Sequence, residues 1–364
     1  MKIPFLDLSR IDLELKERLK SKFSTILNEG VFSGGKEVED LESSVSKILN
    51  SPFAISCANG TDALELALRG LGIGPGDEVI VPAMTWVSTA EAVVLVGAKP
   101  VFVDTDEMGL ITSDWEKAIS PQTKGVIPVH LYGKMVDMEP LISKAKAKNL
   151  FVIEDAAQAF GTFKNGKAAG TWGDIGCLSF YPTKNLGALG EAGMCLTSSL
   201  ELARKIRLLS NHGQPVRDQH ELVGRNSRID AIQAGFLNVF LEEWEENLEK
   251  RKVLAKTYLS GLSGISEIRL PSEIGQRDHN AHLFVIQTKR RDELKTFLAN
   301  NGIGTAIHYP MILPDMKPFA SEGDFENARN LARSGLSLPL NPWLRESEVI
   351  EVIYKVKLFY ASKN

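Results

Sequence analysis

Short apolar runs alternate with amphipathic segments over the first two thirds of the chain. The runs have the length and the β-branched or aromatic content of strands, and the segments between them place apolar residues three and four positions apart. Strands and helices in alternation predict a mostly parallel sheet that is covered on both faces. The expected strands are residues 53–56, 78–81, 100–103, 125–129, 151–153, 175–180 and 194–197, and the expected helices are residues 61–68, 88–96, 138–148 and 200–209.

The pattern changes after Asp230. A highly charged periodic stretch, residues 231–262, has the length of a helix that connects two domains. A β-α-β set is expected after it at residues 282–288, 292–300 and 305–309, followed by helices near residues 324–334 and 346–360. With 364 residues the chain is long enough for two domains. We expect a large α/β domain over residues 1–240 and a small α+β domain over residues 241–364, with the N-terminal segment able to join the small domain.

Composition and charge narrow the class of protein. Hydrophobic residues make up 43% and charged residues 24%, which is typical of a globular chain, and the formal net charge of −4 gives no overall basic field for nucleic acid or an anionic membrane. Residues 1–7 reach a proline and an acid too early for a signal peptide, and no apolar run is long enough to span a bilayer. Cys57, Cys177 and Cys195 have no paired spacing, which is typical of reduced thiols in a cytoplasmic protein.

Common metal and phosphate motifs do not occur, but one helix start has the features of an anion site. The glycines of residues 70–76 lack the G-x-G-x-x-G spacing, and there is no Walker-type loop. The histidines are scattered and neither HExxH nor a paired CxxC is present, so no metal site is expected. Asn59-Gly60-Thr61-Asp62 opens a helix directly after a strand, where free amides bind phosphate and Gly60 removes side-chain obstruction. The carboxylate of Asp62 would repel a phosphate, so we interpret it as a helix-start acid.

Lys184 is the candidate for covalent chemistry. An apolar strand ends at Pro182, and Lys184 follows it before a glycine-rich loop, near the carboxyl edge of the sheet where α/β proteins bind ligands. A lysine there is well placed to form an imine; the alternative is a solvated loop lysine. The strand that starts at Phe151 delivers Asp155 at its carboxyl end, where a carboxylate could hold a pyridine nitrogen protonated. Taken alone, Asp155 would serve equally well as a helix cap or a metal ligand.

Together these segments resemble the DegT/DnrJ/StrS family of pyridoxal-phosphate-dependent sugar aminotransferases. The resemblance implies a fold-type I aminotransferase, with a mostly parallel central sheet flanked by helices and a smaller α+β C-terminal domain, that works as a cytoplasmic homodimer with shared active sites. Several motifs match in the same order over nearly the whole chain. They lie at residues 59–68, 82–104, 154–161, 179–193, 211–213, 224–228 and 307–310.

The resemblance also implies a role for each residue that matches a family motif. Lys184 would form the internal aldimine and move protons, and Asp155 would pair with the pyridinium nitrogen. Gln158 would hydrogen-bond the phenolic oxygen of pyridoxal phosphate, and Trp86 would stack on its ring, for which a core tryptophan is the alternative. The phosphate would lie at Gly60, Thr61, Ser179, the backbone of Asp62 and Asn226 of the partner subunit, and the substrate at Tyr181, His212, His308 and Tyr309.

The implied reaction moves an amino group from L-glutamate through the cofactor to the keto group of a nucleotide-linked sugar. The loop of residues 181–190 most resembles members that act on 3-keto sugars linked to dTDP or UDP, for glycan or polysaccharide biosynthesis, including lipopolysaccharide. Two alternatives stay open. A sugar dehydratase or deoxygenase would have histidine at position 184, and a regulatory homologue would bind a ligand without turnover; the retained Lys184 counts against the first, and the lack of an added DNA-binding domain counts against the second.

The chain departs from the family pattern at a few positions. Phe160 stands where many members have histidine, and Glu191-Ala192 replaces a common Asp-Gly pair. Residues 313–315 also differ from the usual sequence after the His-Tyr-Pro run. We expect these positions around the substrate cleft, where they would bear on specificity more than on chemistry.

Overall fold

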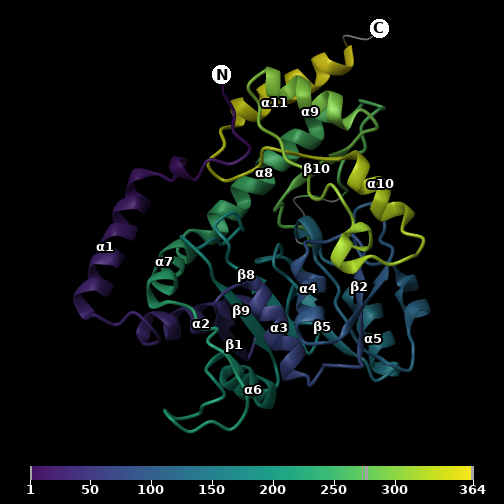
Figure 1. Ribbon diagram of the computed structural model, residues 1–364. Coiled ribbons are helices and arrows are strands. Elements are labelled where there is room, and N and C mark those ends of the chain that lie inside the picture. The colour runs from purple at the N-terminus through teal and green to yellow at the C-terminus, as the bar shows by residue number, and fades with distance from the viewer. Residues whose placement is uncertain (1, 273, 275–277, 362–364) are drawn as a thin grey trace.

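A seven-stranded sheet lies at the centre of the protein, in the order β1-β9-β8-β5-β4-β2-β3 (Figure 1). The computed structural model describes residues 2–272, 274 and 278–361. Strand β9 is antiparallel to both of its neighbours, and the other neighbouring pairs are parallel, so the expected mostly parallel α/β sheet is confirmed. The strands are β1 (Phe53–Cys57), β2 (Glu78–Pro82), β3 (Lys99–Val103), β4 (Thr123–Val126), β5 (Phe151–Asp155), β8 (Ile175–Ser179) and β9 (Gly193–Thr197).

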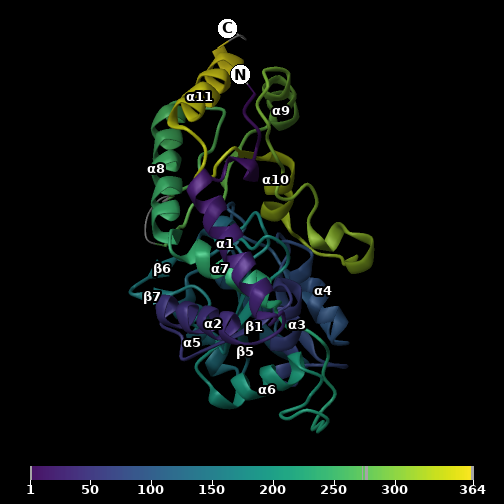
Figure 2. The same ribbon diagram turned by 90° about the vertical axis from the view of Figure 1, so that its left-hand side faces the viewer.

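Helices cover both faces of this sheet because successive strand residues point to opposite sides. Ile55 and Ile153 belong to one buried cluster, whereas their neighbours Ala54 and Val152 belong to another. The first cluster lies under α3 (Gly60–Gly70), α4 (Ser88–Leu95) and α6 (Leu200–Ser210). The second lies under α2 (Lys36–Leu49), α5 (Met138–Ala147) and α7 (Ala231–Leu241), and α1 (Leu13–Glu29) packs beside α7 (Figure 2). The hydrophobic pattern had not led us to expect α1 and α2.

A third buried cluster joins the C-terminal elements and includes Ile3 from the start of the chain. The backbone amide of Ile3 donates to the carbonyl of Gly302 at 2.8 Å, so the N-terminal segment packs with the C-terminal part. The division of the chain at residue 240 itself stays a prediction. The elements of this part are α8 (Trp244–Leu262), α9 (Arg291–Asn300), α10 (Glu326–Ser334), α11 (Glu346–Ala361) and the antiparallel pair β10 (Phe284–Gln287) and β11 (Gly335–Leu338). A short hairpin, β6 (Phe163–Lys164) and β7 (Lys167–Ala168), follows β5.

Two details of the sequence prediction were wrong. Residues 305–309 do not form a strand: Ala306 makes an isolated bridge to Ser337, and β11 is the partner of β10. Residues 231–262 are not one helix, because the chain breaks between α7 and α8. The apolar α7 is buried over the sheet, whereas α8 leaves the sheet for the third cluster (Figure 1). Arg18 pairs with the carboxylates of Glu242 and Glu243 at this break.

Candidate functional site

Lys184 lies in the loop after β8, at the carboxyl edge of the parallel strands. Its backbone amide donates to the carbonyl of Tyr181 at 2.8 Å. This hydrogen bond closes a turn that directs the chain away from the strand. Burial lowers the pKa of the Lys184 amine from 10.5 to about 8, and the negative charge of Asp155 opposes this shift. A buried amine with a lowered pKa is partly neutral near physiological pH, and the neutral form is the nucleophile. The solvated loop lysine is thus the weaker interpretation.

Asp155 ends β5, the strand beside β8, and is almost fully buried. Its Oδ2 accepts a hydrogen bond from the hydroxyl of Thr89 at 2.8 Å, and its Oδ1 accepts one from the amide of Ala157 at 3.2 Å. Thr89 in turn lies 3.0 Å from the hydroxyl of Thr85. Two donors therefore fix the orientation of the carboxylate. The role of Thr89 could not be predicted from the sequence, because nothing near this threonine in the chain indicates that its hydroxyl binds Asp155.

The neighbouring acid, Glu154, has a different and structural role. It is fully buried, and its two oxygens accept hydrogen bonds from His130 Nε2 and from three backbone amides at 2.6 to 2.9 Å. His130 Nδ1 accepts from the amide of Val136, so Nε2 carries the proton that is donated to Glu154. The three amides belong to Gly170, Trp172 and Gly173. Glu154 ties that loop to β5, which leaves Asp155 as the acid that faces the Lys184 site.

One amide side chain, Gln158, and two aromatic side chains, Trp86 and Tyr309, lie on the Asp155 side of the site. Gln158 accepts the amide hydrogen of Tyr132 at 2.6 Å and donates from Nε2 to the hydroxyl of Tyr309 at 3.2 Å. The rings of Tyr309 and Trp86 lie 5.4 Å apart. Trp86 is 56% exposed, which excludes the alternative of a core tryptophan and leaves an aromatic face open to a ligand. Burial and the charge of Asp155 raise the pKa of Tyr309, so its hydroxyl stays protonated.

His308 brings the C-terminal part of the chain to the same place. Its carbonyl accepts a hydrogen bond from the Tyr132 hydroxyl, and its Nδ1 lies 2.8 Å from the hydroxyl of Ser337. Burial, with a smaller contribution from the charge of Lys184, lowers the pKa of His308 to about 4. The imidazole is therefore neutral at physiological pH. It can donate or accept a hydrogen bond without bringing a positive charge to the site.

The start of α3 has free backbone amides, as the expected anion site requires, with one difference. Asn59 caps the helix by accepting the amide hydrogen of Asp62 at 2.8 Å, so this amide is already used. Among the described residues, the amides of Gly60 and Thr61 have no hydrogen-bond partner. A Cβ on residue 60 would lie 2.7 Å from Cβ of Ser179, so only glycine allows the helix start and the end of β8 to approach this closely. Gly60, Thr61 and Ser179 are thereby brought together.

The Asp62 carboxylate points away from this anion site. It accepts hydrogen bonds from Arg225 Nη2 at 2.9 Å and from the Ser227 hydroxyl at 2.6 Å. Asn226 lies between these two residues and is exposed. Alternate residues of an extended segment point to opposite sides, so the side chain of Asn226 faces away from Asp62 of its own chain.

Two further candidate residues are exposed. His212 lies in the loop after α6, where its carbonyl accepts from His220 Nδ1 and its amide donates to the carbonyl of Arg225. These contacts do not connect His212 with Lys184. Tyr181 is 46% exposed and precedes Lys184 by three positions.

Two of the positions that depart from the family pattern are buried. The Phe160 ring packs edge-on against Phe180 and Trp244, with ring centroids 6.2 and 5.5 Å apart, and is 6% exposed. Ala192 is fully buried, and its carbonyl accepts the amide hydrogen of Phe180 at 2.8 Å. The apolar ring of Phe160 fills the core where Trp244 of α8 meets the sheet. That these positions lie around the substrate cleft stays a prediction.

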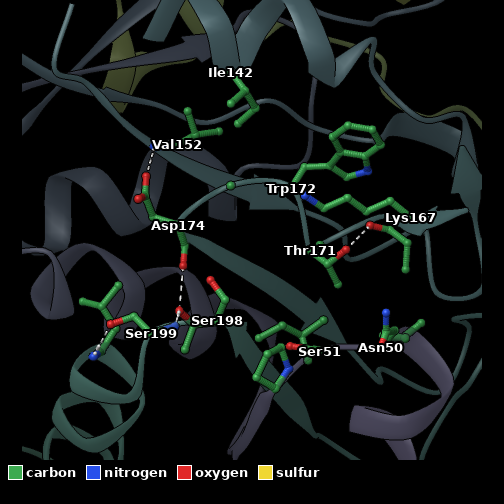
Figure 3. A pocket seen from close by; sticks show the side chains of 18 of the residues that line it. Asn50, Ser51, Ile142, Val152, Lys167, Thr171, Trp172, Asp174, Ser198 and Ser199 are labelled. Carbon is green, nitrogen blue, oxygen red and sulfur yellow. Dashed lines mark hydrogen bonds between the residues drawn. The ribbon is translucent and has the colours of Figure 1, made fainter. Parts of the chain in front are cut away.

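A cavity of about 630 Å³ lies at the opposite edge of the sheet (Figure 3). Asp174, which lines it, accepts the amide hydrogen of Val152 at 2.8 Å where β5 begins, and the amine of Lys167 lies 4.7 Å from the centre of the Trp172 ring. This cavity contains neither Lys184 nor Asp155. Ligands of open α/β sheets bind outside the carboxyl ends of the strands, so the Lys184 edge is the stronger candidate.

Neither a metal-binding cluster nor a membrane-spanning helix occurs in the part of the chain that the structure describes. It contains no group of three or more His, Cys, Asp or Glu side chains that could hold a metal ion. Within the same residues, none of the helices combines the length and apolar character that crossing a bilayer requires.

Comparison with known proteins agrees with this geometry. Residues 13–357 match the DegT/DnrJ/EryC1/StrS aminotransferase family. The chain belongs to this family.

Family members of known name or structure cover nearly the whole chain. The chain is 42% identical to the UDP-N-acetyl-3-dehydro-alpha-D-glucosamine 3-aminotransferase of Acidithiobacillus ferrooxidans, with 96% of each chain covered. It is 40% identical to a protein of Geobacillus stearothermophilus named pleiotropic regulatory protein, with 99% of each covered. The crystal structure of S. venezuelae DesV in complex with a ketimine intermediate superimposes with a TM-score of 0.95 at 39% identity, covering 99% of this chain and 98% of DesV.

Proposed function

We propose that the protein is a pyridoxal-phosphate-dependent aminotransferase that moves an amino group from L-glutamate to the keto group of a 3-keto sugar linked to UDP or dTDP. The observation that carries this proposal is the buried amine of Lys184, with its lowered pKa, beside the oriented carboxylate of Asp155. The names of the A. ferrooxidans relative and of DesV support the reaction type and the nucleotide-sugar class.

The residues at the carboxyl edge fit pyridoxal phosphate in each of its parts. Lys184 would bind its aldehyde carbon, and Asp155 would face its ring nitrogen. The exposed face of Trp86 suits a flat ring, and the free amides of Gly60 and Thr61 suit its phosphate. When bound, the cofactor supplies an electron sink next to the carbon that loses a proton.

The protein side chains would then hold and move protons. Asp155, oriented by Thr89, would keep a proton on the ring nitrogen through a charge-assisted hydrogen bond. The Lys184 amine, with a pKa of about 8, is suited to accept a proton from the donor carbon and to return it, because a general base works best near the working pH. Gln158, held by Tyr132 and Tyr309, would orient the phenolic oxygen of the ring.

We also infer a homodimer in which Asn226 of the partner subunit reaches the phosphate site. Its outward orientation, between two residues that bind Asp62, supports this. A set of large apolar side chains on α1 and the segment after it is exposed, as expected of a surface that a second subunit covers. They are Leu13, Phe23, Leu27, Val31 and Phe32.

We also infer the compartment in which the enzyme works and the kind of biosynthesis it serves. Free, buried thiols at Cys57, Cys177 and Cys195 agree with a cytoplasmic enzyme. We infer that its amino-sugar product serves glycan or polysaccharide biosynthesis, including lipopolysaccharide.

A regulatory protein without turnover is the second candidate, favoured by the name of the G. stearothermophilus relative. The buried Lys184 amine argues against it, because a sensor has no need of an amine kept partly neutral by burial. The same lysine argues against a dehydratase or deoxygenase.

Transfer of an isotope label tests the reaction directly. The protein loaded with pyridoxal phosphate is incubated with ¹⁵N-labelled L-glutamate and a panel of 3-keto and 4-keto sugars linked to UDP or dTDP, and products are identified by mass and by the position of the new amine. We expect ¹⁵N on carbon 3 of at least one sugar, and none with Lys184→Ala. A product aminated at carbon 4 alone would overturn the regiochemistry, a deoxygenated product would favour the dehydratase, and no labelled sugar would contradict the proposal.

A further inference from the structure

The Arg251 side chain is buried, and none of the carboxylates that the structure describes pairs with it. Arg251 lies in α8 and is 4% exposed. Its Nη1 donates to the carbonyl oxygens of Leu340 at 3.0 Å and His282 at 3.3 Å, and both acceptors are uncharged. Its Nε is buried with no hydrogen-bond partner, and no carboxylate of the described residues pairs with the guanidinium.

An arginine in this state is unusual because a charge is costly to remove from water unless it is paired. Two carbonyl oxygens satisfy Nη1 and leave the other nitrogens of the guanidinium, Nε and Nη2, without acceptors among the described residues. These two nitrogens form the edge with which arginine binds a carboxylate through two parallel hydrogen bonds. An anionic group of a bound ligand would supply the missing partner.

A small cavity connects Arg251 with the reactive lysine. Arg251, Lys184 and Asn185 line one cavity of about 30 Å³, together with residues that include Asn247 and Trp343. This volume is enough for one or two water molecules, which corresponds to the two oxygens of a carboxylate but not to a sugar ring.

His282 contacts both Arg251 and the residue that follows Lys184. Its carbonyl accepts from Arg251, and its Nδ1 lies 3.0 Å from Oδ1 of Asn185, the residue after Lys184. A ligand group that binds Arg251 in this cavity is thus held next to the loop that carries the amine.

We propose that Arg251 binds a carboxylate of the amino-acid donor and so holds the donor's amino group at the Lys184 site. This rests on the proposed aminotransferase function, in which the donor is the substrate that always brings a carboxylate. A keto sugar with a uronate group would offer the same chemistry, and the experiment below separates the two sources.

Binding of glutarate to the protein loaded with pyridoxal phosphate tests the proposal without turnover. Glutarate has the two carboxylates of glutamate and no amino group, and its affinity is measured by calorimetry for the wild type, Arg251→Gln, Arg251→Lys and the control Lys250→Gln. Lys250 is half-exposed on the same helix and pairs with Glu246. We expect Arg251→Gln to weaken glutarate binding at least tenfold, Arg251→Lys to weaken it less, and Lys250→Gln to leave it unchanged.

The half-reaction with L-glutamate, followed by the absorbance of the cofactor, provides the second readout. Arg251→Gln is expected to raise the glutamate concentration for half-maximal rate at least tenfold, with a smaller change in the maximal rate. Unchanged glutarate and glutamate affinities in a folded Arg251→Gln protein would overturn the proposal. So would an effect confined to keto sugars that carry a carboxylate, because that would place the sugar at Arg251.

Two further arms keep the outcomes distinct. If Arg251→Gln does not fold, the wild type is assayed with the two monoamides of glutamate: we expect one of them to lose at least tenfold in affinity, and equal use of both would overturn the proposal. If the wild type shows no half-reaction with glutamate, the proposed function fails on its own, whatever Arg251 binds.

Discussion

Replacing Lys184 by methionine should stabilise the cofactor-free protein, and the stabilisation should be lost as the pH rises from about 8 to 10.5. Burial lowers the pKa of this amine from 10.5 to about 8. At about 1.4 kcal/mol for each pH unit, the folded state loses up to about 3 kcal/mol by keeping the amine protonated. A buried methionine does not have this cost.

The sign of the pH dependence follows from the two pKa values. Below pH 8 the amine is protonated in the folded and the unfolded protein, so the full cost is present. Between about pH 8 and 10.5 the folded protein binds fewer protons than the unfolded one, and the stability of the wild type rises with pH. Above pH 10.5 the amine is neutral in both states and the cost is gone.

Urea unfolding of the two proteins between pH 7 and 10.5 measures this difference. Lys184→Met is expected to be more stable than the wild type at pH 7, with a gap that closes by up to about 3 kcal/mol as pH rises. The matched control Lys124→Met replaces an exposed lysine of β4, and its difference from the wild type should not change with pH in this way. A gap for Lys184→Met that is independent of pH would refute the reasoning.

Three further substitutions test other parts of the site. Gly60→Ala places a Cβ 2.7 Å from that of Ser179, and the resulting strain of about 1–3 kcal/mol should weaken binding of pyridoxal phosphate, measured by titration, by roughly tenfold to a hundredfold. Thr89→Val removes a hydrogen bond to Asp155 and should lower kcat by roughly tenfold to a hundredfold without releasing the cofactor. Glu154→Gln replaces one carboxylate oxygen by an NH2 group that faces hydrogen-bond donors, and it should lower the free energy of unfolding, measured in urea, by about 3–6 kcal/mol.

Each of these has a control on the same chain. Gly74→Ala meets its nearest atom at 3.7 Å and should bind the cofactor normally; equal affinities for both alanine variants would contradict the packing argument. Thr257→Val, whose exposed hydroxyl bonds only the backbone of its own helix, should keep full kcat. Glu191→Gln changes an exposed acid and should leave stability within about 0.5 kcal/mol, and a Glu154→Gln protein as stable as this control would remove the structural role given to Glu154.

The sequence predicted the central sheet well because its signals are local. Most strands of the sheet are short apolar runs, and amphipathic helices lie next to β1, β2, β5 and β9 in sequence, so the pattern of residues 53–209 identifies the elements that position Lys184 and Asp155. The break between α7 and α8 was missed because both halves keep a helical period, and only packing against different clusters separates them. Residues 305–309 were predicted as the second strand of a β-α-β set, whereas β10 pairs with a later segment, β11.

The candidate site was predicted in part for the same reason. Gly60, Lys184 and Asp155 stand at ends of elements, where position in sequence fixes position in the sheet. Thr89 and Arg251 stand within helices, and their importance comes from what faces them across the fold: the carboxylate of Asp155 for Thr89, and the lack of a carboxylate for Arg251. No pattern along the chain contains that information.

The attachment of the cofactor to Lys184 tests the central claim most directly. The protein is reconstituted with pyridoxal phosphate, reduced with borohydride to make the attachment permanent, and digested for peptide mass analysis. We predict that the reduced cofactor is found on the peptide that contains Lys184 and on no other, and that Lys184→Ala retains none after reduction. Reduced cofactor on a different lysine, or none on the wild type, would contradict the account.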